Sequence, residues 1–212
     1  MAAAKAAGAT RGAGGRSARE HRAANVRADA QRNRVAILRA TMDALRKDPD
    51  ASVAQIAAEA GVGRMTLYGH FRTRPELIEA ALVDSLDRGE AVLHEVDLNG
   101  DARQAFSRLI TSSWTLVDQS RALLAAAQKE LPPARIRELH QKAEARVRDL
   151  LARGQREGAF RTDLPVSWLL ATTHVVMHGA ADELSAGRLT PEDAARFIDT
   201  TLQAAFASSA QS

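Results

Sequence analysis

The chain of 212 residues contains no cysteine, and aromatic residues make up only 4% of it. A disulfide framework, a thiolate nucleophile and a cysteine-bound zinc ion are therefore excluded, and the composition fits a reducing cytoplasm. Long hydrophobic runs are also missing, because two threonines and two histidines interrupt the most apolar stretch, residues 168–181. We therefore expect a cytoplasmic protein without a membrane-spanning segment or a membrane partner.

Sequence motifs of several enzyme classes are absent as well. The chain has no Glu-x-x-His pair as in di-iron bundles, no Gly-x-Ser-x-Gly elbow and no Gly-Lys phosphate loop. His174 and His178 stand four residues apart, a spacing that suits a shared metal ion, but no carboxylate stands at a matching distance along the chain. We therefore expect no enzymatic activity, no cofactor and no metal ion.

Residues 52–74 predict two short helices joined by a glycine-bearing turn. Ser52 has Gln55 three residues later, which is the capping-box spacing of a helix start. Gly61 then suits the left-handed cap that often ends a helix. The chain must turn at this glycine, and a second short helix follows near Gly63.

The second short helix has two unlike faces. Leu67 and Phe71 stand four residues apart and point inward. The remaining side chains form a short, basic, hydrogen-bonding outer face: Arg64, Met65, Thr66, Tyr68, Gly69 and His70. Taken alone, Tyr68 and His70 are more typical of packed or surface residues than of contacts to a ligand.

Residues 66–71, T-L-Y-G-H-F, resemble the T-L-Y-x-H/Y-F signature of the tetracycline-repressor (TetR) family of bacterial transcriptional regulators. The resemblance extends over residues 34–86, including the Ala-Gly-Val turn at 60–62. It implies an all-α fold of about nine helices, in which a three-helix helix-turn-helix domain precedes a larger ligand-binding and dimerisation domain. The implied domains are an arm (1–30), the helix-turn-helix domain (31–76), the larger domain (77–207) and a tail (208–212).

In the family the third helix enters the major groove of DNA. By position, the resemblance assigns hydroxyl, phenol and imidazole groups to phosphates, and assigns Arg64, Met65 and Gly69 to base edges. Gly63 stands where the family usually has Ser or Thr, so base reading depends more on Arg64, Met65 and DNA shape. Ser52 and Arg74 are assigned to the DNA backbone on either flank. The complete expected DNA-binding set is Ser52, Gly63, Arg64, Met65, Thr66, Tyr68, Gly69, His70 and Arg74.

Positive charge is concentrated at the start of the chain. The formal net charge is +3, yet residues 1–34 hold eight Lys or Arg against two Asp or Glu. We predict a disordered arm over residues 1–30 whose arginines follow DNA phosphates or enter a minor groove, the alternative being a solvated tail. These arginines are Arg11, Arg16, Arg19, Arg22 and Arg27.

Helical spacing continues to the end of the chain, without strand alternation. It predicts helices over 31–47, from residue 73 onward, through 106–117, a short one ending before Leu131-Pro132-Pro133, then 136–151, 165–186 and 191–207. The helix over 165–186 is apolar on much of its circumference, and in the family the helices corresponding to the last two form a dimer interface. The expected interface residues are Trp168, Val175, Met177, Phe197, Ile198, Leu202 and Phe206.

The resemblance also implies a pocket for a small-molecule effector among the middle helices. Candidate lining residues are Phe106, Trp114, Leu116 and His174, each of which is alternatively a core residue. The expected protein is thus a ligand-responsive homodimeric repressor, nucleoid-associated in bacteria, on a near-palindromic double-stranded DNA operator. The alternatives are a helix-turn-helix nucleoid or recombination factor without effector response and, least favoured, an all-helical enzyme.

Overall fold

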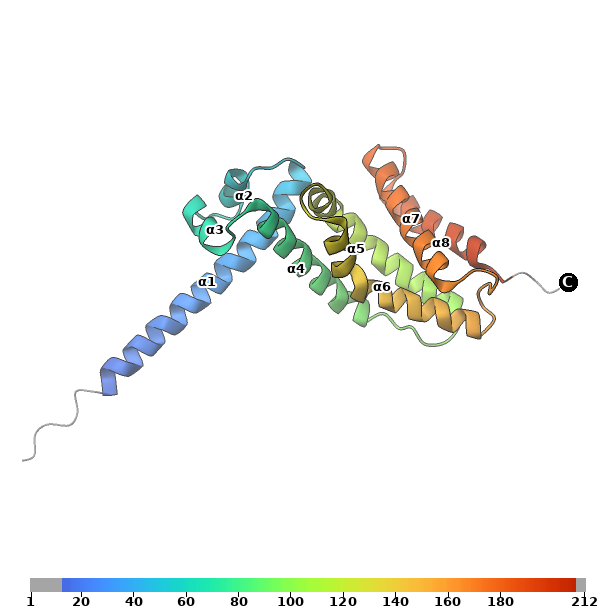
Figure 1. Cartoon of the computed structure of the whole chain (residues 1–212), viewed down its shortest axis with the longest axis horizontal. Helices are drawn as coiled ribbons and strands as arrows, with labels where there is room; N and C mark the ends of the chain where they lie inside the picture. The colour runs from blue at the N-terminus through green and yellow to red at the C-terminus, as the bar shows by residue number, and fades with distance from the viewer. Residues whose placement is uncertain (1–12, 209–212) are drawn as a thin grey trace, which may run out of the picture.

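The computed structural model describes residues 13–208, and all of its named elements are helices (Figure 1). In chain order these are α1 (Ala13–Lys47), α2 (Val53–Glu59), α3 (Arg64–His70), α4 (Arg74–His94), α5 (Ala102–Glu130), α6 (Pro133–Arg156), α7 (Val166–Ser185) and α8 (Pro191–Phe206). Within this range, extended pairing is limited to one isolated bridge between Phe160 and Ala207. The predicted all-α fold is confirmed.

The first helix, α1, is longer than the sequence indicates. The pattern predicts a helix over 31–47 after a disordered arm, whereas α1 already begins at Ala13. Alanine and arginine, both good helix formers, are frequent in the added turns. Figure 1 shows this part of α1 projecting beyond the other helices. The disorder prediction is therefore wrong for residues 13–30, and residues 1–12 and 209–212 lie outside the described part.

The fifth helix, α5, replaces two predicted helices. The pattern predicts one helix through residues 106–117 and a separate short one before Leu131, but α5 runs unbroken for 29 residues. No glycine or proline occurs between Ala102 and Glu130, so nothing in the backbone interrupts it. Residues 13–208 therefore contain eight helices where the sequence predicts about nine.

Side-chain caps fix the starts of α2 and α4. The Ser52 hydroxyl accepts a hydrogen bond from the Gln55 amide at 3.3 Å, and the Gln55 side chain accepts one from the Ser52 amide at 2.7 Å. Thr73 Oγ1 accepts from the Glu76 amide at 3.2 Å. Gly61, with a φ of 66°, turns the chain between α2 and α3. The predicted capping box and glycine turn are both present.

The apolar side chains form two cores that share α5. The N-terminal core lies among α1 to α4 and includes Leu123 and Ala127 from the last turns of α5. The C-terminal core lies among α5 to α8 around the rings of Phe106, Phe160 and Phe206, whose centroids are 5.5 to 6.4 Å apart. The packing of α5 in both cores joins the helix-turn-helix region to the rest of the molecule.

Candidate DNA-binding surface and ligand cavity

Helix α3 is held against α1 and α2 by two inward side chains. Leu67 and Phe71 are each 1% exposed and belong to the N-terminal core. The Arg34 guanidinium of α1 lies 4.6 Å from the centroid of the Phe71 ring, a cation–π contact that further fixes the end of α3. One face of this seven-residue helix is thus committed to packing.

The opposite face of α3 is open to solvent. Met65 is 84% exposed and Tyr68 39% exposed, and Arg64, Thr66 and Gly69 are exposed as well. An exposed methionine of this degree has no packing role within the chain, so it stands free to contact a partner. His70 is only half-buried, and its ring centroid lies 6.3 Å from that of Phe71.

Ser52 and Gly63 lie at the starts of α2 and α3. The Ser52 hydroxyl is already engaged in the cap of α2, where it also lies 2.7 Å from Gln55 Oε1. Gly63 caps α3 without a side-chain hydrogen bond, and a Cβ placed on it would approach only Thr66 Oγ1, at 3.9 Å. Both residues are exposed.

Arg74 is not placed as the sequence predicts. Its Nη1 donates to the Ala51 carbonyl oxygen at 2.9 Å, and its Nε lies 2.8 Å from Glu130 Oε1. The side chain is only 26% exposed. Arg74 therefore joins the start of α4 to the loop before α2 and to the end of α5, and the prediction that it holds a DNA phosphate is corrected.

Sequence reasoning passed over Arg72, which directly follows α3 and is exposed. Among residues 13–208, neither Arg64 nor Arg72 has an ion-pair partner, whereas Lys47 is paired with Glu59 at 2.7 Å. Two uncompensated guanidinium groups thus flank the outer face of α3. The position of Arg72 just after the T-L-Y-G-H-F segment was a usable signal in the sequence.

The arginines of the predicted arm are only partly described. Arg22 and Arg27 are exposed on the projecting part of α1. Arg11 and the side chains of Arg16 and Arg19 lie outside the described part of the chain.

A cavity of about 310 Å³ opens between α4, α5, α6 and α7. Its volume is at the lower end of the range for small-molecule sites. Leu116 and His174, both predicted to line a pocket, are part of its wall. Phe106 and Trp114 do not line it: they pack in the C-terminal core instead, where they are 0% and 4% exposed, so their prediction as pocket residues is corrected.

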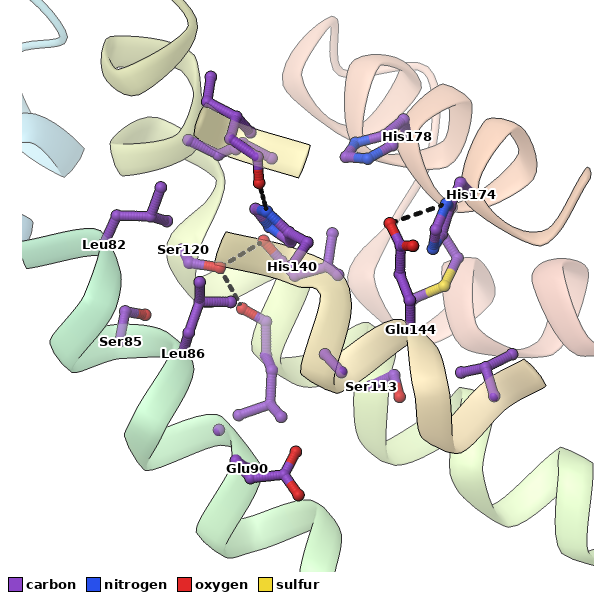
Figure 2. A pocket seen from close by; sticks show the side chains of 18 of the residues that line it. Leu82, Ser85, Leu86, Glu90, Ser113, Ser120, His140, Glu144, His174 and His178 are labelled. Carbon is purple, nitrogen blue, oxygen red and sulfur yellow. Dashed lines mark hydrogen bonds and ion pairs between the residues drawn. The ribbon is translucent and has the colours of Figure 1, made fainter. Parts of the chain in front are cut away.

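One wall of the cavity carries polar groups that the sequence analysis missed. Figure 2 shows His140 and Glu144 on α6 opposite His174 and His178 on α7. The His174 Nδ1 lies 3.9 Å from Glu144 Oε1, so Glu144 supplies the carboxylate that appeared to be missing from the sequence. The i, i+4 spacing within each helix was visible, but not that the two helices face each other.

Burial is the main cause of the lowered pKa of His174, and the nearby imidazoles of His178 and His140 and the Arg148 guanidinium lower it further. Glu144 raises it, but less than burial lowers it. The pKa of His178 is also lowered, through desolvation and through His140. At neutral pH both rings are therefore uncharged.

The predicted dimer-interface residues fall into two groups. Trp168 and Val175 on α7 and Phe197 on α8 are 59%, 71% and 45% exposed, so large apolar side chains face solvent there. The others are at most 6% exposed within the chain and cannot reach a partner, so their assignment is corrected to the chain's own packing: Met177, Ile198, Leu202 and Phe206. Met177 additionally lines the cavity.

Every helix in residues 13–208 is too short or too polar to cross a bilayer. Over the same residues, no three His, Asp or Glu side chains converge in a way that would hold a metal ion.

Known proteins share both the helix-turn-helix segment and the fold. Residues 37–81 match the model of the bacterial regulatory proteins, tetR family. The HTH-type transcriptional repressor LfrR of Mycolicibacterium smegmatis is 34% identical over 87 residues, which is 41% of this chain and 46% of that protein. The HTH-type transcriptional repressor KstR2 of Rhodococcus jostii is 27% identical over 135 residues, 60% of this chain and 66% of that protein. The matched segments span less than two thirds of either relative.

Solved structures extend the likeness of the fold to about four fifths of the chain. A crystal structure of LfrR in complex with proflavine superposes with a TM-score of 0.67 at 24% identity, covering 81% of this chain and 94% of that one. A transcriptional regulator from Rhodococcus sp. superposes with a TM-score of 0.68 at 20% identity, covering 82% and 95%. The exposed outer face of α3 and the matched family segment around it show that residues 37–81 form a helix-turn-helix domain of the tetR family of bacterial regulatory proteins, and the solved structures show that the larger part of the chain shares their fold.

Proposed function

We propose that the protein is a dimeric transcriptional repressor that binds a near-palindromic operator and releases it when a small organic molecule fills the cavity. The observation that carries the proposal is the division of α3 between a packed face and a solvent-facing one. Leu67 and Phe71 are each 1% exposed, whereas Met65 is 84% exposed. The proposal places the protein in the bacterial cytoplasm, where it has access to the chromosome.

The exposed groups of α3 suit DNA chemically. Arg64 presents a fork of donors that fits the O6 and N7 atoms of guanine, and Met65 can pack against a thymine methyl group. Thr66 and Tyr68 carry hydroxyl groups that can donate to phosphate oxygens and fix the register of the helix. Arg72 takes the flanking phosphate contact that the sequence had assigned to Arg74.

A second copy of the chain is the proposed cover for the apolar side chains on α7 and α8. Trp168, Val175 and Phe197 are large and exposed, and such groups on neighbouring helices mark an interface. A two-fold axis through this face would set two α3 helices about one DNA turn apart, roughly 34–36 Å or a multiple of it. The operator would then be a near-palindrome.

Helix α4 offers a route from the cavity to the DNA-binding surface. Leu82 lies in the N-terminal core and also lines the cavity. A ligand that displaces Leu82 would therefore alter the packing of the helix-turn-helix region. Coupling of this kind must be reciprocal between ligand and operator. The LfrR structure with proflavine gives a precedent for a small organic ligand in this fold.

Selection of bound fragments from the source genome tests the proposal. We expect enrichment of a near-palindromic site, and fluorescence anisotropy with that site should show binding by a dimer that weakens as salt rises. Binding that is indifferent to sequence would favour the nucleoid or recombination factor instead. Failure to bind any duplex at moderate salt would refute the proposal.

A further inference from the structure

The ionisable side chains of the cavity are concentrated on one of its walls. The wall formed by α4 and α5 has six leucine and valine side chains, Leu82, Leu86 and Leu116 among them, interspersed with three serines, Gln128 and a single ionisable side chain, Glu90. The wall formed by α6 and α7 carries Arg137 and a cluster of four further ionisable side chains, His140, Glu144, His174 and His178 (Figure 2). A molecule that fills this space must therefore combine an apolar body with a polar group at one side.

The imidazole of His140 presents a hydrogen-bond acceptor. Its Nδ1 lies 2.8 Å from the Ile136 carbonyl oxygen, and a carbonyl oxygen can only accept, so Nδ1 carries the proton in this contact. In the neutral ring, Nε2 is then left with a free lone pair. A ligand group meeting this nitrogen has to be a donor.

Glu144 places a carboxylate beside the imidazoles without a buried counter-ion. Its Oε1 lies 3.9 Å from His174 Nδ1, beyond hydrogen-bond distance. Its Oε2 lies 3.6 Å from Arg148, whose side chain is 47% exposed, so water screens that charge. Arg137, the basic side chain in the lining, is also exposed.

The second carboxylate in the lining, Glu90, is neutralised locally. Its Oε1 pairs with Arg146, and the two side chains are only 17% and 19% exposed. Its Oε2 is buried without a hydrogen-bond partner in the described part of the chain. The cavity thus has acceptors on α4 as well as on α6, and Glu144 is left with the weaker compensation.

An acidic ligand would find no protonated imidazole to pair with at the α6 and α7 wall, and a carboxylate that repels it. His174 would have to bind a proton to pair with an anion, yet burial and the neighbouring imidazoles hold its pKa below the ordinary value. The Glu144 carboxylate would repel the anion in addition. A cation needs no proton transfer and pairs with the carboxylate as it stands.

We propose that the cavity selects an organic cation: an aromatic or aliphatic body lies against the leucine wall, and a protonated amine donates to Glu144 and to His140 Nε2. This inference rests on the proposed function, since it names the class of effector for the same cavity. A charge-assisted hydrogen bond in a partly dry site gives the amine its advantage over an acid or an alcohol of the same shape.

Three probes with the same ring test the charge preference directly: 1-naphthylmethylamine, 1-naphthylmethanol and 1-naphthoic acid. Calorimetric titration of the full chain, free of DNA and at neutral pH, should show the amine binding about tenfold more tightly than the alcohol, with the acid weakest. Tighter binding of the acid, equal binding of all three, or binding of none would overturn the proposal.

Two charge-removing variants assign the preference to Glu144. Glu144→Gln should reduce the advantage of the amine to within about threefold of the alcohol, because it keeps the shape and removes the charge. Asp149→Asn, on the exposed side of the same helix, should leave the advantage intact. An unchanged preference in Glu144→Gln would contradict the assignment, and the wild-type probe series decides the ligand class even if that variant fails to fold.

Because the titrations use protein without DNA, this proposal and the proposed function fail separately. Loss of operator binding in the genomic selection would refute the repressor function, while the charge preference found in the titrations would still stand. Preference for the acid would refute the ligand class and leave operator binding intact.

Discussion

At the scale of single residues, Arg64 and Arg72 show how position decides what an exposed charge can do. Both side chains are exposed and without an ion-pair partner among residues 13–208. Arg64 begins α3, where the helix would enter the groove, whereas Arg72 follows its end. The first therefore belongs to base reading in our proposal and the second to the phosphate backbone.

Replacing these arginines one at a time should separate the two roles. Arg64→Ala should lower affinity for the selected operator and relax preference at one base pair, by about 1–3 kcal/mol of discrimination. Arg72→Ala should weaken binding to all duplexes alike and reduce its salt dependence. Anisotropy on the operator and on single-base variants measures both. A uniform loss in Arg64→Ala would show that Arg64 does not read bases.

Two glycines give a matched test of packing in the two halves of the molecule. A Cβ at Gly154 of α6 would lie 2.1 Å from a ring carbon of Phe160, whereas one at Gly69 of α3 would meet nothing within 4 Å. Gly154→Ala should therefore destabilise the protein by about 1–3 kcal/mol, because the packed ring has to move. Gly69→Ala should stabilise it by about 0.5–1 kcal/mol through helix propensity. Urea unfolding measures both, and equal effects would contradict the packing described here.

At the scale of helices, the sequence predicted the helix-turn-helix well because its signals are local. The Ser52–Gln55 box and the Gly61 turn act over a few residues, so one sequence is enough to place them. The length of α1 and the continuity of α5 were missed for the opposite reason. Gly14 and Gly15 disfavour a helix at the start of α1, although the helix begins there, and no local signal in α5 shows that its two predicted parts are continuous.

The cavity was harder to predict, because periodicity shows that a side chain points inward but not which interior space it enters. Phe106 and Leu116 both lie on inward faces of α5, yet the first is in the aromatic core and the second lines the cavity. Arg74 illustrates the same limit. Its partner Glu130 is 56 residues away in the sequence, and no spacing rule connects them.

The contact between α6 and α7 should give stability a pH dependence. His174 faces Glu144, His178, His140 and Arg148, and its folded-state pKa is lowered from the ordinary 6.5. The unfolded chain then binds the proton more readily than the folded chain. The free energy of unfolding is therefore at its highest above about pH 6.5 and decreases as the pH falls below that value. Urea unfolding over a pH series should show this fall.

Removal of the imidazole identifies its source. His174→Gln should reduce the decline below pH 6.5 and leave the part that His178 contributes, whereas His94→Gln, at a histidine whose side chain is 79% exposed, should leave the whole decline in place. An unchanged pH profile in His174→Gln would assign the dependence to other groups.

At the scale of the whole molecule, the exposed apolar face on α7 and α8 governs assembly in our proposal. Val175→Glu would bury a charge in the dimer interface and should yield a monomer by light scattering. Operator affinity should then fall about a hundredfold or more, because the two α3 helices of a dimer bind the operator together and a monomer offers only one. Val92→Glu makes the same change at a 52% exposed site on α4 and should leave both properties unaltered. A dimeric Val175→Glu variant would move the interface elsewhere.

The packing of α5 in both cores limits how the molecule can be divided. Leu123 and Ala127, near the end of α5, complete the N-terminal core. The other helices of that core, α1 to α4, end about thirty residues earlier in the chain, at His94. A fragment that ends after α4 would therefore lack the α5 side chains of the N-terminal core and would expose apolar residues of α1 to α4 to solvent. Chimeras that join α1 to α4 of this protein to the larger domain of a related regulator should fold only when the final turns of α5 are transferred together with α1 to α4.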